Sequence, residues 1–212
     1  VCMGASISLG HGAQQVFDTI EGNKMRVVSV IGDSTFFHTG INSLLDVAYN
    51  KSNLVTVVLD NRITAMTGQQ DNPGSGRTIH GEVTEAVSIE AIVRAFGFKN
   101  VRVIDPNQLS EVKEALDWAL TLQEPSVIIT RWPCALKKQT ALDKEEFKGS
   151  FTSVYWVNEE ICIGCKKCTR TGCPAIVFQF AKKKSSIDPE KCVGCSVCAQ
   201  VCPVQAIQKV EA

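Results

Sequence analysis

The sequence predicts a three-layer α/β domain with a parallel sheet, residues 1–133, followed by a small α+β domain, residues 154–212. The first domain is predicted from apolar, β-branched runs that alternate with amphipathic stretches. The second is predicted from its cysteines, because eight of the ten in the chain lie between Cys162 and Cys202. Residues 134–153 are polar and charged without sustained periodicity, which indicates a linker with a short helix around Asp143 to Lys148.

Short apolar runs predict the strands of the first domain. They are Val27–Ile31, Leu54–Leu59, Val101–Ile104 and Ser126–Thr130. The first two are continuous and β-branched, which is typical of strands buried on both faces of a parallel sheet. The amphipathic stretches that predict helices are Ile41–Tyr49, Ser88–Phe96 and Leu109–Leu122. This alternation favours right-handed crossovers and helices on both faces of the sheet.

Composition and hydropathy do not support a nucleic-acid partner or a membrane partner. The 22 basic and 22 acidic residues balance, so bulk charge does not support a nucleic-acid partner. No apolar run approaches the length of a bilayer span and no signal peptide opens the chain, so we expect no membrane partner and a cytoplasmic location. The chain begins with Val1, and we therefore expect it to start partway through a longer polypeptide.

The second domain contains one cysteine motif twice. The pattern Cys-x-x-Cys-x-x-Cys, followed by Cys-Pro, begins at Cys162 and again at Cys192. It is the bacterial ferredoxin run for [4Fe–4S] clusters, in which the fourth cysteine of each run binds the other cluster. The predicted ligands of the first cluster are Cys162, Cys165, Cys168 and Cys202, and those of the second are Cys192, Cys195, Cys198 and Cys173.

Two features of these motifs need a separate interpretation. The first copy has four residues between Cys168 and Cys173 instead of three, an insertion that a loop beside Gly172 can absorb. Structural zinc is the alternative, but it uses two separated C-x-x-C pairs for each ion, whereas here a third cysteine follows at the same spacing. The basic run Lys182–Lys184 is interpreted as a solvated turn between the copies rather than a docking patch.

Polar residues follow the first two predicted strands. GDS at 32–34 follows one strand and DN at 60–61 follows the next. Ligands of open α/β sheets bind beyond the carboxyl ends of strands, so these segments predict a site. A divalent cation that holds a diphosphate requires hard oxygen ligands. The Asp33 carboxylate, the Asn61 amide oxygen and the Ile63 carbonyl would supply three for Mg²⁺.

This arrangement resembles the thiamine-diphosphate motif, GDG followed further along by N, with Ser34 in place of the last glycine. The segment from Met66 to Gln69 is similar to the M-T-G-G-Q segment of 2-oxoacid:ferredoxin oxidoreductases. Residues 2–6 of this chain resemble the start of the thiamine-binding domain in that family. Residues 32–40 resemble the metal loop of its indolepyruvate members. A thiamine domain followed by a two-cluster ferredoxin domain is similar to the C-terminal portion of the large (alpha) subunit of those members.

The resemblance implies a component of an enzyme that oxidatively decarboxylates a 2-oxoacid, most closely indolepyruvate and other arylpyruvates, to the acyl-CoA and carbon dioxide. Electrons would pass through two [4Fe–4S] clusters to an external ferredoxin. The implied cofactors are these clusters, thiamine diphosphate and Mg²⁺. The implied partners are coenzyme A, a beta (gamma-type) subunit and a pyrimidine-binding domain that supplies a glutamate. Because no segment here supplies that glutamate, we expect the chain to be inactive alone.

The resemblance also implies which residues contact the cofactor. They are Cys2, Gly4, Gly32, Asp33, Ser34, Thr35, Asn61, Ile63, Met66 and Thr67. His38 and His11 are the candidate catalytic histidines, with a structural role as the alternative for each. The stretch 68–76 lacks the G-K-[S/T] ending of a phosphate loop and is interpreted as a flap over the site.

Two other functions fit the same residues. One is a related oxidoreductase that acts on pyruvate, 2-oxoglutarate or branched-chain oxoacids. The other is a non-enzymatic, ferredoxin-type electron-transfer protein whose α/β domain serves only for docking. Binding of thiamine diphosphate in the presence of magnesium separates the enzyme from the docking scaffold.

Overall fold

The computed structural model describes residues 2–147 and 153–210, and the chain divides into two compact units. The first unit comprises the chain up to Pro106 together with Ser110–Lys138. The second comprises Asn107–Leu109 and the chain from Gln139 onward. Each unit is described by itself. No helix in the described parts of the chain is both long and apolar enough to cross a bilayer.

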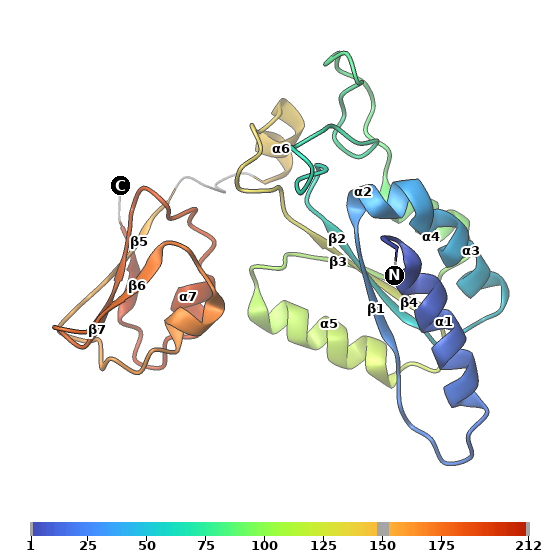
Figure 1. Cartoon of the computed structure of the whole chain (residues 1–212), viewed down its shortest axis with the longest axis horizontal. Coiled ribbons are helices and arrows are strands. Elements are labelled where there is room, and N and C mark those ends of the chain that lie inside the picture. Colours follow the sequence, from blue (N-terminus) through green and yellow to red (C-terminus); the bar gives the residue numbers. More distant parts are fainter. Residues whose placement is uncertain (1, 148–152, 211–212) are drawn as a thin grey trace. The chain divides into compact units, whose positions relative to one another are not determined.

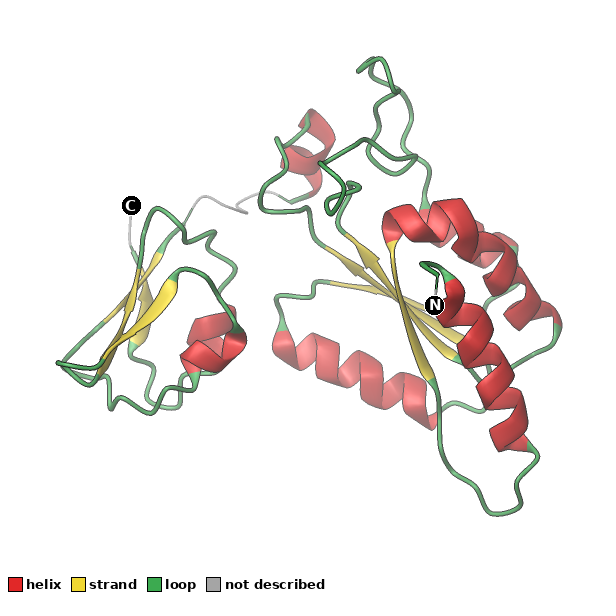
Figure 2. Ribbon diagram, in the orientation of Figure 1, coloured by secondary structure: helices red, strands yellow, loops and turns green. Residues whose placement is uncertain are grey.

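A parallel four-stranded sheet forms the centre of the first unit (Figures 1 and 2). The strands are β1 (Val28–Gly32), β2 (Val55–Asp60), β3 (Asn100–Ile104) and β4 (Ser126–Arg131). Their order across the sheet is β1-β2-β4-β3, and every neighbouring pair is parallel. Each strand lies within one residue of its predicted bounds, which confirms the four apolar runs as strands.

Helices cover both faces of this sheet (Figure 1). Helices α1 (Ala5–Asp18), α3 (Ile41–Tyr49) and α4 (Ile89–Ala95) pack on one face, against a core that includes Val58, Val127 and Ile129. Helix α5 (Leu109–Thr121) packs on the other face through Ala115 and Ala119. The three-layer α/β prediction is therefore confirmed. Helix α1 has no counterpart among the predicted helices.

The prediction that the first strand is buried on both faces is wrong. Ser29 and Ile31 are buried, but Val28 is 39% exposed and Val30 is 50% exposed. The reason is that β1 lies at the edge of the sheet, while the core under α5 is built from residues of β2, β3 and β4. The first four residues of β2 are buried, as expected for a strand that has a neighbour on each side.

Two antiparallel strand pairs form the second unit. Strand β5 (Tyr155–Val157) pairs with β8 (Ile207–Lys209), and β6 (Ile176–Gln179) pairs with β7 (Lys184–Ile187). A cysteine motif lies between β5 and β6 and another between β7 and β8 (Figure 1). The motifs lead into a 3₁₀ turn, η2 (Cys168–Thr171), and a short helix, α7 (Val197–Gln200). The α+β prediction is confirmed.

The predicted short helix of the linker is helix α6 (Ala141–Glu146). It begins two residues earlier than expected because Thr140 caps it. The Thr140 hydroxyl accepts from the backbone N–H of Asp143, and the Asp143 carboxylate accepts from that of Thr140. Residues 148–152 and 211–212 lie outside the described residues. They include Lys148, the last residue of the predicted helix.

Candidate functional site

A cavity of about 530 Å³ opens at the carboxyl ends of β1 and β2. The two strands are paired in register, with Gly32 beside Leu59, so the chain leaves both strands at the same place. After β1 the chain turns directly into helical structure, α2 (Asp33–Thr35) and a π-helical turn, η1 (Phe36–Gly40). The cavity is lined by Met3, Gly32, Asp33, Ser34, Thr35, His38, Thr39, Asn61, Ile63, Thr64, Ala65, Met66 and Thr67.

Asp33 is the most buried charged group of this cavity, with 2% of its surface exposed. Its Oδ1 accepts a hydrogen bond from the backbone N–H of Ser34 (2.7 Å). Its Oδ2 accepts from the backbone N–H of Ile63 (3.2 Å) and from the side-chain amide of Asn72 (3.2 Å). Burial raises the pKa of Asp33, and these donors oppose the rise without cancelling it. The carboxylate therefore lies where a cation would stabilise it.

Asn61 brings a second hard oxygen to the same point. The nitrogen of Ile63 lies 3.1 Å from Asn61 Oδ1 and 3.2 Å from Asp33 Oδ2, so both oxygens converge on one backbone N–H. A carboxylate and an amide oxygen held together on rigid backbone are ligands suited to Mg²⁺. Both side chains of the predicted metal site therefore meet in the structure.

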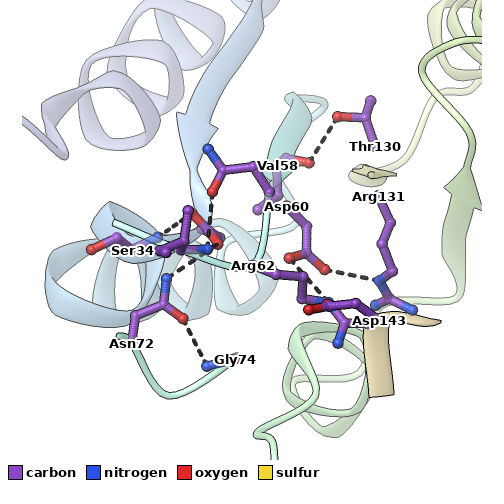
Figure 3. Close-up of polar contacts among 12 residues, drawn as sticks. Ser34, Val58, Asp60, Arg62, Asn72, Gly74, Thr130, Arg131 and Asp143 are labelled. Carbon is purple, nitrogen blue, oxygen red and sulfur yellow. Dashed lines mark hydrogen bonds and ion pairs between the residues drawn. The ribbon is translucent and has the colours of Figure 1, made fainter. Parts of the chain in front are cut away.

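A buried ion pair anchors the loop that carries Asn61. Asp60, the last residue of β2, accepts from Arg131 Nε of β4 (2.8 Å), and Arg62 Nε lies 3.6 Å from its other oxygen (Figure 3). Asp60 is itself buried. Because Arg131 is on the neighbouring strand, the pair ties the end of β2 to the sheet and so holds Asn61 in place.

A chain of side chains connects Ser34 to His38 on the cavity wall. Thr64 Oγ1 donates to Ser34 Oγ (2.8 Å), and Ser34 Oγ lies 3.5 Å from His38 Nδ1. Since the Ser34 oxygen accepts from Thr64, its own proton is free to be donated to His38 Nδ1. The helical conformation of Ser34 explains why serine is tolerated where the thiamine motif has glycine.

Three of the predicted residues lie outside the lining. Cys2 is exposed, and Gly4 precedes α1 with a left-handed backbone (φ +91°). A Cβ on Gly4 would collide with the Thr39 hydroxyl, so glycine lets the start of α1 approach this cavity residue. His11 faces α3, with Nε2 3.5 Å from Asp46 Oδ2. The structure does not bring His11 to the cavity.

Asn72 and Thr64 complete the site but are absent from the predicted set. Asn72, which Figure 3 labels, belongs to the stretch interpreted as a flap, yet it is buried and its amide donates to Asp33. Its own oxygen accepts from the backbone N–H of Gly74 (2.9 Å). The sequence signal for such a turn is Asn followed by Pro and Gly, which marks an Asx turn but does not reveal which group the amide reaches.

The lining residues fit a diphosphate with its cation. A Cβ on Gly32 would meet no atom within 4 Å, so glycine leaves open space beside Asp33. Ser34, Thr35 and Thr67 border the same space. Oxygen ligands for a metal therefore lie beside an opening of suitable size for a diphosphate.

The first cysteine quartet, Cys162, Cys165, Cys168 and Cys202, lines one narrow cavity in the second unit. Apolar residues, including Val157 and Ile207, form most of the remaining wall, which Lys166, Lys167 and Ser185 complete. Cys168 Sγ lies 3.3 Å from Ser185 Oγ, and the backbone N–H of Ala206 donates to Cys202 Sγ (3.3 Å). An apolar wall with a few donors aimed at sulfur is the environment that iron–sulfur clusters occupy.

The second quartet is Cys173, Cys192, Cys195 and Cys198. Burial, together with the nearby thiol groups of Cys195, Cys173 and Cys192, raises the pKa of Cys198 to about 12. The backbone N–H of Tyr155 donates to Cys192 Sγ (3.4 Å). All ten cysteines are free thiols. In the described part of the chain, no three His, Cys, Asp or Glu side chains are placed to hold one metal ion.

The fourth cysteine of each run thus lies with the three of the other run. Cys202 shares a cavity with the first three, and Cys173 lies near enough to Cys198 to shift its pKa. The ferredoxin spacing predicts crossed ligand sets of this kind, and ligation of clusters by these cysteines stays a prediction. The extra residue before Cys173 lies next to Gly172, whose backbone is left-handed (φ +70°), so the loop absorbs it without displacing the cysteine.

Comparisons with known proteins agree with both units. Residues 1–130 match the family described as thiamine pyrophosphate enzyme, C-terminal TPP binding domain, and residues 155–209 match the 4Fe-4S dicluster domain. A 2-oxoglutarate:ferredoxin oxidoreductase from Magnetococcus marinus, solved with 2-oxoglutarate, coenzyme A and succinyl-CoA bound, is 17% identical. The match has a TM-score of 0.56 and covers 68% of this chain and 50% of that one, and it supports the fold alone.

Curated relatives match almost the whole chain. Indolepyruvate oxidoreductase subunit IorA of Pyrococcus horikoshii is 43% identical over 99% of this chain and 33% of its own length. The subunit of the same name from Archaeoglobus fulgidus is 40% identical, over 98% of this chain and 32% of its own. The chain therefore spans about a third of the length of these relatives. Through residues 1–130 the chain belongs to the thiamine pyrophosphate enzymes, as a C-terminal TPP binding domain that is followed here by a 4Fe-4S dicluster domain.

Proposed function

We propose that this chain is the cofactor-binding and electron-exit part of a thiamine-diphosphate-dependent 2-oxoacid:ferredoxin oxidoreductase. The observation that carries the proposal is the convergence of the Asp33 and Asn61 oxygens at a 530 Å³ cavity, in a chain that also holds two crossed cysteine quartets. The names of the curated relatives favour indolepyruvate and other arylpyruvates as substrates. The products would be the acyl-CoA and carbon dioxide.

In this proposal Mg²⁺ is held by the Asp33 carboxylate, the Asn61 amide oxygen and the Ile63 carbonyl. Gly32, Ser34, Thr35, Met66 and Thr67 border the diphosphate and the rest of the cofactor, and Cys2 and Gly4 lie at the start of the helix beside it. When bound, thiamine diphosphate supplies the electron sink for loss of carbon dioxide. The chain contributes the binding, the orientation and a site from which bulk water is displaced.

His38 is the histidine that the geometry favours for contact with the substrate. It lines the cavity, and the Ser34 hydroxyl, which accepts from Thr64, lies 3.5 Å from its Nδ1. Donation by Ser34 to Nδ1 leaves the proton on Nε2, which can then donate to an oxygen of the substrate or diphosphate. His11 faces Asp46 instead, which favours the structural alternative for that residue.

The two quartets would hold the [4Fe–4S] clusters that carry electrons away. Oxidative decarboxylation releases two electrons, whereas each cluster transfers one at a time, so each turnover requires two one-electron transfers to the acceptor ferredoxin.

Coenzyme A takes the acyl group. A pyrimidine-binding domain with its glutamate and a beta (gamma-type) subunit complete the enzyme, and we expect the 212-residue chain alone not to decarboxylate arylpyruvate. Eight free thiols in close pairs favour a cytoplasmic location.

Titration of the 212-residue chain with thiamine diphosphate, with and without Mg²⁺, tests this function. We expect saturable binding that needs Mg²⁺, and a loss of affinity of at least about 100-fold in Asp33→Ala, because a charged metal ligand is removed. Asp71→Ala is the matched control, since Asp71 is an exposed carboxylate near the same loop. Binding that ignores both magnesium and Asp33 would instead support a docking scaffold.

Metal analysis of the anaerobically purified chain tests the second half of the proposal. We expect about eight iron atoms and eight sulfides per chain, because each [4Fe–4S] cluster holds four of each. Two zinc ions per chain and no sulfide would contradict it.

The substrate is decided by kinetics, once the chain is combined with the remainder of the enzyme. The measurement is the ratio of kcat/KM for indolepyruvate to that for pyruvate, 2-oxoglutarate and branched-chain oxoacids.

A further inference from the structure

The two copies of the cysteine motif differ in charge at equivalent positions. Between its second and third cysteines the first copy has Lys166 and Lys167, whereas the second copy has Ser196 and Val197. The difference extends beyond the loop, because residues 161–187 contain six cationic side chains and no acidic one. These cations are Lys166, Lys167, Arg170, Lys182, Lys183 and Lys184. One repeat therefore acts as an internal control for the other.

The fold brings the loop of the first motif and the lysines of the β6–β7 turn together. Gly164 lies so close to the turn between β6 and β7 that a Cβ there would collide with the Lys183 carbonyl. Lys184 Nζ donates to the Cys162 carbonyl. The loop of the first motif and the turn of the β6–β7 hairpin are thus packed together. We call the surface formed by 163–167 and 180–183 the basic face.

Exposed apolar side chains lie within the basic face. Phe180 is 78% exposed and Ile163 is 63% exposed. The ring of Phe180 packs edge-on against Phe178 with centroids 5.2 Å apart. Lys166 Nζ lies 4.3 Å from the centre of the Phe178 ring and 5.0 Å from that of Phe180. An aromatic side chain that is held in place and surrounded by charge is characteristic of a protein-binding surface.

Among the described residues, the corresponding loop of the second quartet has Ser196 and Val197 in place of the two lysines. Cys165 of the first quartet is exposed, whereas each cysteine of the second quartet is buried or half-buried. Each repeat has one lysine in an ion pair, Lys182 with Glu159 (2.8 Å) and Lys191 with Asp188 (2.8 Å), so the two loop lysines Lys166 and Lys167 carry the difference in charge. The first quartet is therefore the one that a partner protein can approach closely.

We propose that the basic face is the docking surface for an acidic iron–sulfur protein, which accepts electrons from a cluster held by the first quartet. This rests on the proposed function for the source of the electrons. In each encounter one electron leaves the reduced cluster and reduces the oxidised partner, and no bond or proton is transferred. Positive charge recruits the acidic partner, and Phe180 and Ile163 supply the apolar contact that excludes water. Lys182 and Lys183, interpreted from the sequence as a solvated turn, belong to this surface.

Exchange between the two motif copies supplies the test variant. Lys166→Ser with Lys167→Val gives the first loop the residues of the second. The backbone should tolerate the change, because Lys166 and Ser196 have the same left-handed conformation (φ 61° and 64°). The control is Lys24→Ser with Lys113→Ser, which removes two exposed lysines from the first unit. Iron content and visible absorbance establish that every variant still holds its clusters.

The measurement is the Kd between the cluster-loaded chain and a purified bacterial-type ferredoxin with two [4Fe–4S] clusters and a strongly negative net charge. We expect the loop variant to raise Kd about tenfold and to flatten its dependence on salt. The control should stay within about twofold of wild type. In Phe180→Ser we expect a weaker complex whose salt dependence is unchanged, since that contact carries no charge.

A second measurement records electron transfer in the stopped flow, from the chain reduced with dithionite to the oxidised ferredoxin. We expect its second-order rate to fall with the same variants. The proposal is overturned if the loop variant binds as tightly as wild type, or if wild type does not bind ferredoxin even at low salt, which would indicate another subunit as the occupant. Neither readout needs thiamine diphosphate or a 2-oxoacid, so failure of the proposed function would leave this result standing.

Discussion

At the scale of single residues, the cavity in the first unit is built around a charge that its surroundings disfavour. Burial raises the pKa of Asp33, so the folded chain binds a proton there more tightly than the unfolded chain does. Stability from this group is therefore present at low pH and falls as pH rises through the raised pKa. At neutral pH the ionised carboxylate destabilises the fold, which is expected of a group retained for its binding chemistry.

Ser34 provides a test of how the cavity orients His38. In Ser34→Ala the imidazole loses the hydroxyl beside Nδ1, and we expect its proton to distribute between both nitrogens instead of remaining on Nε2. The ¹⁵N chemical shifts of the imidazole measure this distribution. Affinity for thiamine diphosphate should change less than about fivefold, because a neutral hydrogen bond contributes only about 1 kcal/mol.

Ser8→Ala is the control for that experiment, because the Ser8 hydroxyl contacts only Ser43 in an exposed pair on α1 and α3. We expect its histidine spectrum to match that of wild type. If the spectrum of Ser34→Ala also matches wild type, Ser34 does not position His38, and the serine would have no role beyond filling the place of a glycine.

At the scale of elements, helix α1 is held against the sheet by a close approach at one glycine. A Cβ on Gly10 would collide with the Ser29 hydroxyl of β1 and would lie 3.1 Å from Leu54 Cδ1. The Ser29 hydroxyl is not free to move away, because it donates to the Ser6 carbonyl (2.7 Å). A residue of low helix propensity is thus required at a position where the helix meets the strand.

Two alanine substitutions, two residues apart on α1, separate packing from propensity. Gly10→Ala should lower the free energy of unfolding by about 1–3 kcal/mol, because the added methyl group overpacks the contact with Ser29. Gly12→Ala should raise it by about 0.5–1 kcal/mol, because Gly12 faces open space and alanine is the better helix former. Urea denaturation of the first unit measures both values. Equal effects of the two substitutions would contradict close packing at Gly10.

At the scale of the whole molecule, the two units depend on different sources of stability. The first unit has a continuous apolar core on each face of its sheet. The core of the second unit consists largely of its own cysteines, joined by small side chains and a few aliphatic ones. A domain this small buries too little apolar surface to be stable without covalent or metal cross-links. Its fold should therefore depend on the clusters.

Removal of iron tests that dependence. After anaerobic chelation we expect hydrogen exchange in residues 155–209 to accelerate by at least about 100-fold, because metal binding and folding are coupled in such domains. Exchange in the strands of the first unit should be unchanged. Mass spectrometry of peptides from both units measures the two rates in one sample. Uniform acceleration across the chain would indicate instead that the units unfold together.

Much of this architecture follows from local sequence. The four strands are apparent from apolar β-branched runs, and α3 occupies the predicted range Ile41–Tyr49. The crossed grouping of cysteines follows from spacing alone, because each short loop can present only three thiols to one cluster. The prediction fails where packing overrides propensity. Helix α1 contains Gly10 and Gly12, which argue against a helix, and its packing against β1 and α3 stabilises it.

By itself the sequence determined the four strands of the sheet and the residues at the carboxyl ends of β1 and β2, and it predicts the ligand pattern of both quartets. The tertiary structure alone decided that Asn72 reaches Asp33, that His11 faces Asp46, and that Lys166 shares a surface with Phe180. The physical reason is range. Periodicity and motif spacing act over a few residues, whereas these contacts depend on how distant segments pack, and no local pattern encodes that packing.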